Sequence, residues 1–161
     1  MQEAASPFCH FSDRACVLAL ESASYCAGIL GATGGQFLDL FPPNPNLDTV
    51  KEAIYKKTVT LFEASFVFGY LFGGGDMRML DRVKKAAYHF GMAFQTADDI
   101  ADREQDEKKK RETSIARLIG KDRALILFEE EMRYFRKSMQ ELDMLTHSFE
   151  KMCDILVKHI S

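Results

Sequence analysis

An apolar stripe that repeats at alternating steps of three and four residues predicts one long helix from about Asp76 to Arg103. Its members are Leu80, Val83, Ala87, Phe90, Phe94, Ala97 and Ala101. This period excludes a strand over the same residues, because side chains on a strand alternate between faces at every second residue. The rest of the chain must therefore supply partners for a helix buried along one face.

Polar side chains border this stripe near its carboxyl end. At about 100° per residue, Gln95, Asp98 and Asp102 line one edge of the buried face. Asp99 points further out on the same projection, and Gly91 leaves room one turn earlier for a close approach to the backbone. The helix thus predicts two carboxylates and an amide beside an apolar surface.

Carboxylates one helical turn apart repel each other and weaken a helix by roughly 0.2–0.5 kcal/mol. They also lose hydration beside an apolar face unless they are paired. A cation removes both penalties, and two hard oxygen ligands suit Mg²⁺, which completes its octahedron with water and substrate phosphates. The spacing alone is equally consistent with a solvated acidic edge paired with Arg103 and the following lysines.

A second long helix is predicted from Asp48, which caps it, to about Phe72. Between Thr58 and Gly75 its only charge is Glu63, so most of this helix is expected to be buried. Its first turns carry lysines and are polar. The change from polar to apolar suits a ligand with an anionic head and a hydrocarbon tail.

The glycines at 73–75 predict a turn that sends the 76–103 helix back antiparallel to the one before it. Counting from this turn at about 1.5 Å per residue leaves Thr58 and Asp98 offset by about 12 Å, a gap that Gln95 and Gly91 partly close. Lys57 and Thr58 are therefore expected near Gln95 and Asp98.

An earlier helix is predicted to begin at Ser12-Asp13. One face is rich in small side chains: Ala15, Leu18, Ala19, Ser22, Cys26 and Ile29. Small residues allow close packing of helices, either against a partner chain or within this domain. The glycines at 31, 34 and 35 end this pattern near Gln36 and Asp39, and the prolines at 42, 43 and 45 predict a loop.

The remaining features predict one soluble, all-α domain over residues 1–161, a helical bundle with two or three more helices after Ile115. The net charge of −3 gives no basis for nucleic-acid binding. No apolar run approaches the length of a transmembrane segment, so none is expected. Four scattered cysteines fit a reducing compartment, which favours the cytoplasm without excluding an organelle.

Four short elements occur in a fixed order: Gly35-Gln36-x-x-Asp39-Leu40, Lys57-Thr58 followed by Leu61-Phe62-Glu63-Ala64, Phe94-Gln95-x-x-Asp98-Asp99-x-x-Asp102, and Thr113–Gly120. In order and spacing they resemble the trans-isoprenyl diphosphate synthases (polyprenyl synthetase family), whose second aspartate-rich motif the third element matches. The resemblance runs from about Ala15 to the C-terminus. The family's first aspartate-rich motif is expected before Ala15, where nothing matches. The resemblance implies the C-terminal half of an isoprenoid-synthase-type fold.

The resemblance also implies a chemistry, which is Mg²⁺-dependent head-to-tail transfer of a prenyl group from an allylic diphosphate to isopentenyl diphosphate. The implied metal ligands are Asp98 directly, Asp102 through water or as a second ligand, and Asp99 as a further candidate. The implied substrate-binding and catalytic residues are Lys57 and Thr58 beside the allylic diphosphate, Gln95 beside the developing cation, Phe94 at the isopentenyl site, Lys110 or Arg111 at the diphosphate, and Gln36 in support.

A family enzyme places its two aspartate motifs on opposite walls, so this chain alone is expected to be an inactive half of a prenyltransferase. It would act as a homo-oligomer, or paired with an N-terminal half or a full synthase. The alternative is a non-catalytic regulatory or partner subunit of a complete prenyl synthase. A terpene synthase relative is a more distant third, against which the Lys-Thr and Gly-Gln elements argue.

Overall fold

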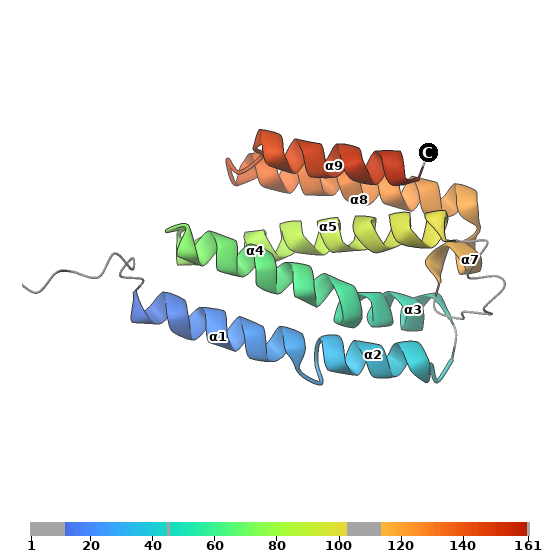
Figure 1. Cartoon of the computed structure of the whole chain (residues 1–161), viewed down its shortest axis with the longest axis horizontal. Coiled ribbons are helices and arrows are strands. Elements are labelled where there is room, and N and C mark those ends of the chain that lie inside the picture. Colours follow the sequence, from blue (N-terminus) through green and yellow to red (C-terminus); the bar gives the residue numbers. More distant parts are fainter. Residues whose placement is uncertain (1–11, 45, 103–113, 161) are drawn as a thin grey trace, which may run out of the picture.

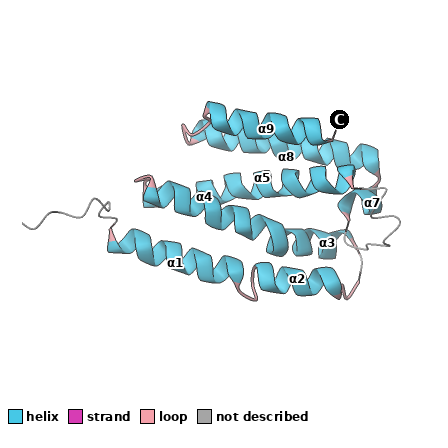
Figure 2. Cartoon of the chain, in the orientation of Figure 1, coloured by secondary structure: helices cyan, strands magenta, loops and turns pink. Residues whose placement is uncertain are grey.

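The computed structural model describes residues 12–44, 46–102 and 114–160, and this part of the chain contains helices and no strand (Figure 2). The α-helices are α1 (Asp13–Ala27), α2 (Ala32–Leu40), α3 (Leu47–Ile54), α4 (Thr60–Phe72), α5 (Leu80–Ala101), α7 (Ile115–Ile119), α8 (Lys121–Glu141) and α9 (His147–His159). A π-helical segment, η1 (Tyr55–Val59), joins α3 to α4, and a 3-10 turn, η2 (Met77–Met79), precedes α5. The predicted all-α bundle is confirmed.

The helices lie in three layers, with α4 and α5 between the α1–α2 layer and the α8–α9 pair (Figure 1). Helix α5 packs against both α4 and α8, and α4 packs against α1. The largest core cluster joins α5, α8 and α9 around Phe90, Phe128 and Phe135. The helix first recognised by its apolar stripe is therefore the centre of the bundle.

Local signals set several helix ends. Ser12 caps α1, its side-chain oxygen accepting from the backbone N–H of Ala15 at 3.2 Å. The glycines at 73–75 form the predicted reversal between α4 and α5 (Figure 1), and Gly74 has a φ of 81° that few other residues adopt. Helix α3 begins at Leu47 and is capped by Asn46, not by Asp48 as predicted; the Asn46 side chain accepts from Thr49 N–H at 2.9 Å.

The small-residue face of α1 is covered by this chain itself. Ala15 and Ala19 are buried against Val67 and Leu71 of α4, which decides between the two readings of that face. Ile29, expected on it, lies beyond the end of α1 and is exposed. The opposite side of the α1–α2 layer remains open and apolar, with exposed Val17, Leu20, Ile29, Leu30, Phe37, Leu40 and Phe41.

One stretch of the described chain, Asp13–Leu40, is long and apolar enough to cross a membrane by length and composition, although none was expected from the sequence. It comprises two helices separated by a turn, and 28% of its most apolar window is buried. The mostly buried core helix of a soluble protein and a signal sequence near the N-terminus both pass the same test.

Candidate functional site

The predicted Lys-Thr pair lies in the π-helical segment η1. A π turn holds about one residue more than an α turn. Such segments are rare in proteins, and those that occur often lie at functional sites. Val59 of this segment is fully buried against α5, while Lys57 and Thr58 are half-buried. A Cβ added at Gly91 would lie 3.0 Å from the Val59 Cα, so the room that Gly91 leaves is occupied by η1. The sequence pattern predicted a continuous helix here and missed the π turn.

A chain of hydrogen bonds joins η1, α5 and α7. The Thr58 hydroxyl donates to Gln95 Oε1 at 2.8 Å, and Gln95 Nε2 donates to Asp99 Oδ1 at 2.9 Å. Asp99 Oδ2 then accepts from the backbone N–H of Ile115 at 2.6 Å. The predicted meeting of Thr58 with Gln95 is confirmed across 37 positions of sequence.

Lys57 is held from the other side by α2. Its ammonium group pairs with the carboxylate of Asp39, which is the more buried partner, with 13% of its side chain exposed against 34% for Lys57. Gly35 makes this approach possible, since a Cβ there would lie 2.2 Å from the backbone nitrogen of Lys57. Asp39 therefore lies close to the candidate site and contacts it through Lys57. Gln36, in the same element, is exposed on α2.

Asp98 lies at the open rim of this network, with 41% of its side chain exposed. Its Oδ2 is 3.5 Å from Gln95 Nε2, a weak contact, and its Oδ1 is 4.0 Å from His159 Nε2 at the end of α9. Asp102 ends α5 as its C-cap, its backbone N–H donating to the Asp98 carbonyl. The proximity of His159 had no signal in the sequence, because it depends on how α9 folds back.

The helical projection was wrong about Asp99. It placed this residue furthest from the buried face, yet Asp99 is 1% exposed while Asp98 is half-exposed. The projection assumes that one face of a helix is buried. Here α7 covers a second side of α5, and Asp99 faces its first residue.

No three His, Cys, Asp or Glu residues within 12–44, 46–102 and 114–160 come together as a metal site. A magnesium ion takes one or two protein carboxylates and fills its other positions with water and phosphate. The half-exposed Asp98 with Asp102 one turn later fits that smaller requirement. Lys110 and Arg111, the predicted diphosphate contacts, lie outside the described residues.

An aromatic surface continues from the polar rim. Phe94 is 38% exposed, and its ring centroid lies 5.1 Å from that of Phe62, which in turn meets Phe90 at 5.1 Å. Leu61, on the same helix as Phe62, is 50% exposed. The predicted isopentenyl contact Phe94 thus belongs to an apolar surface that is open in this chain.

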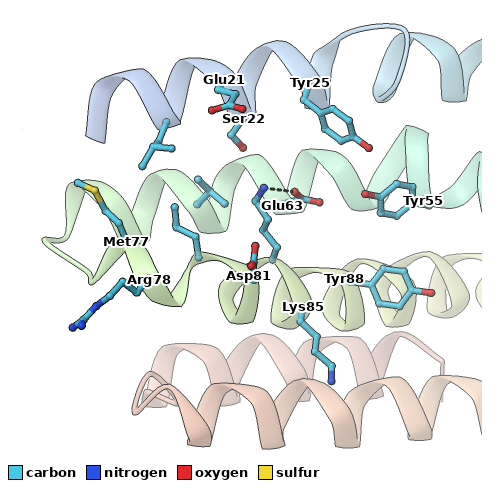
Figure 3. Close-up of a pocket in the computed structure, with 14 residues that line it drawn as sticks. Glu21, Ser22, Tyr25, Tyr55, Glu63, Met77, Arg78, Asp81, Lys85 and Tyr88 are labelled. Carbon is cyan, nitrogen blue, oxygen red and sulfur yellow. Dashed lines mark ion pairs between the residues drawn. The ribbon is translucent and has the colours of Figure 1, made fainter. Parts of the chain in front are cut away.

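The close-up in Figure 3 shows a different hollow, a cavity of about 760 Å³ between α1, α4 and α5. None of the predicted site residues lines it. Its centre holds the buried carboxylate of Glu63, paired with Lys84 at 3.6 Å. Burial raises the pKa of the Tyr55 and Tyr88 phenols on its wall. This cavity is separate from the Thr58–Gln95–Asp98 rim.

Comparison with known proteins places these features in a family. A trans-prenyltransferase of African swine fever virus is 29% identical over 91 residues, and a chloroplastic geranylgeranyl pyrophosphate synthase of Arabidopsis thaliana is 38% identical over 80 residues. The matched stretches span 27% and 22% of these two relatives.

Solved structures extend the likeness to nearly the whole chain. An FPP/GFPP synthase from Zymomonas mobilis has a TM-score of 0.76 at 23% identity, covering 93% of this chain and 52% of that one. A geranyltransferase from Helicobacter pylori, in complex with magnesium and isoprenyl diphosphate, has a TM-score of 0.70 at 22% identity, with 92% and 53% covered. The chain thus has the fold of about half of these enzymes. Residues 22–122, more than half of the sequence, match the polyprenyl synthetase model, and the chain belongs to the polyprenyl synthetase family.

Proposed function

We propose that this chain is a single helical domain that supplies one wall of an isoprenyl diphosphate synthase, the wall that carries the second aspartate-rich motif. The observation that carries the proposal is the Thr58–Gln95 hydrogen bond at 2.8 Å. It joins the Lys-Thr element to the Gln-x-x-Asp element, although 37 positions separate the two side chains. Membership of the polyprenyl synthetase family makes prenyl transfer the reaction to test.

In the proposed reaction an allylic diphosphate ionises, isopentenyl diphosphate attacks the resulting cation through its double bond, and a proton is lost. Mg²⁺ bound by Asp98 and Asp102 would neutralise charge on the departing pyrophosphate. Lys57, whose ammonium group is paired with Asp39 in this structure, would add positive charge there by turning toward the diphosphate. The Thr58 hydroxyl and the Gln95 carbonyl oxygen face the place where positive charge develops, and the open apolar surface at Phe94 and Leu61 accepts hydrocarbon.

We infer that the isolated chain does not turn over, because the cavity of about 760 Å³ lies elsewhere, between α1, α4 and α5, and Asp98 and Phe94 are exposed at an open rim. A second chain, or a further part of a longer one, would have to close it. The test is to mix the chain with dimethylallyl and isopentenyl diphosphates and Mg²⁺. Mg²⁺ binding by titration without condensation supports the proposal, and efficient condensation contradicts the need for a second wall.

A non-catalytic partner subunit is the second candidate, favoured by the exposed apolar side of the α1–α2 layer, which includes Leu20 and Phe37. A surface of this kind often marks a protein interface. Two results together would select this function over the first. They are binding to a complete synthase, and an effect on its activity that Asp98→Ala leaves unchanged.

A further inference from the structure

The carboxylate of Asp99 is turned away from the open rim and into the contact between α5 and α7. It is 1% exposed, and each of its oxygens accepts a hydrogen bond. Oδ1 accepts from Gln95 Nε2 at 2.9 Å, and Oδ2 accepts from the backbone N–H of Ile115 at 2.6 Å. Its neighbour Asp98, in contrast, is half-exposed at the rim.

An ionised carboxylate can only accept hydrogen bonds, whereas the two ends of a glutamine amide differ. In its ionised form Asp99 therefore requires the NH₂ end of Gln95 on its own side. The oxygen end must then point the other way, where it accepts the Thr58 hydroxyl at 2.8 Å. Thr58 does not impose this orientation, because a hydroxyl can donate or accept.

We propose that Asp99 is a positioning residue that fixes the orientation of the Gln95 amide, and that it is not a metal ligand. The orientation itself follows from the hydrogen bonds of this chain, and its catalytic consequence rests on the proposed prenyl transfer. A carbonyl oxygen presented toward Thr58 stabilises positive charge nearby, and the reversed amide would present N–H hydrogens there instead. Of the two adjacent aspartates, one then serves the metal and the other serves the amide.

The test replaces the carboxylate by an amide of the same shape, Asp99→Asn, with Asp98→Asn as the matched control one residue away. The introduced amide still accepts from Ile115 N–H through its oxygen and now offers N–H to Gln95, so the Gln95 amide is expected to reverse. NMR reports the reversal directly. In the wild type, nuclear Overhauser effects join the Gln95 amide protons to residue 99, and in Asp99→Asn they should join them to Thr58. Asp98→Asn should keep the wild-type pattern, and an unchanged pattern in Asp99→Asn overturns the inference.

A second variant decides the matter even where Asp99→Asn does not fold. Thr58→Val removes the other partner of the amide. If Asp99 sets the orientation, the nuclear Overhauser effects between the Gln95 amide protons and residue 99 persist in Thr58→Val. Their disappearance assigns the orientation to Thr58 and refutes the proposal.

Titration with Mg²⁺ separates this inference from the proposed function. The affinity of Asp99→Asn for Mg²⁺ is expected to stay within about twofold of the wild-type value. The affinity of Asp98→Asn should fall at least about fivefold, because Mg²⁺ sites use only one or two protein carboxylates. A comparable loss in Asp99→Asn makes it a ligand and overturns the inference. A wild-type chain that binds no Mg²⁺ counts against the proposed function, while the NMR result still decides the role of Asp99.

Discussion

The middle and the carboxyl end of α5 bury their side chains in different ways. In the middle, the Phe90 ring lies 5.0 Å from Phe135 and 5.9 Å from Phe66, measured between centroids. At the end, Asp99 is equally buried but accepts hydrogen bonds from the Gln95 amide and the Ile115 backbone N–H. Apolar contacts depend on area more than on direction, whereas hydrogen bonds weaken steeply with angle. The middle of α5 therefore contributes mainly to stability, and its carboxyl end fixes the orientation of the Gln95 and Asp99 side chains.

Removing an aromatic side chain of α8 that packs against the middle of α5 should have the largest effect on stability. Phe135 is fully buried and meets Phe66, Phe90 and Phe149. Phe135→Ala is expected to lower the free energy of unfolding by about 3–5 kcal/mol. Urea unfolding followed by circular dichroism measures the loss. The matched variant is Phe94→Ala, whose ring is 38% exposed and should cost clearly less. Equal losses would remove the distinction between core and rim.

A methyl group at Gly35 should disturb the other side of the rim. Its Cβ would lie 2.2 Å from the Lys57 backbone nitrogen, so α2 must move away from η1 and from the Asp39–Lys57 pair. We expect Gly35→Ala to destabilise the chain by about 1–3 kcal/mol. The control is Gly69→Ala in α4, where a Cβ meets nothing within 4 Å. That variant should gain about 0.5–1 kcal/mol. A neutral Gly35→Ala would show that the contact between α2 and η1 is loose.

Deleting the buried carboxylate tests the polar end of α5. Asp99→Ala leaves the N–H groups of Ile115 and Gln95 without this acceptor, in a site that is 1% exposed. The expected loss of unfolding free energy is about 1–3 kcal/mol. Thermal and urea unfolding give the value, and Asp98→Ala serves as the reference. Equal losses of unfolding free energy in Asp99→Ala and Asp98→Ala would contradict the comparison.

The smallest effect on stability is expected at the rim itself. Asp98→Ala removes a half-exposed carboxylate whose polar contacts with Gln95 and His159 are long, so the free energy of unfolding should change by no more than about 0.5 kcal/mol. Affinity for Mg²⁺ should nevertheless fall at least about fivefold, since magnesium sites use one or two carboxylates. Isothermal titration of folded protein measures this. Unaltered Mg²⁺ binding would place the cation elsewhere on this chain.

Much of the bundle follows from local sequence. The Ser12 cap, the glycines at 73–75 and the three-and-four periodicity each act over a few residues, and the helices they predicted are present. The meeting of Thr58 with Gln95 also followed, because a short turn between two helices fixes their antiparallel register. Which of the two neighbouring carboxylates, Asp98 or Asp99, is buried could not be predicted, because that depends on which helices pack over each side chain.

The sequence by itself determined an all-α chain, its antiparallel helices and the polar side chains near one end of α5, because periodicity, caps and turns are local properties. Only the tertiary structure decided the π turn at Lys57-Thr58, the pairing of Asp39 with Lys57 and the burial of Asp99. Each of these requires two segments distant in sequence to meet. The docking of α2 and α7, which no single-helix pattern encodes, therefore sets the geometry of the candidate site.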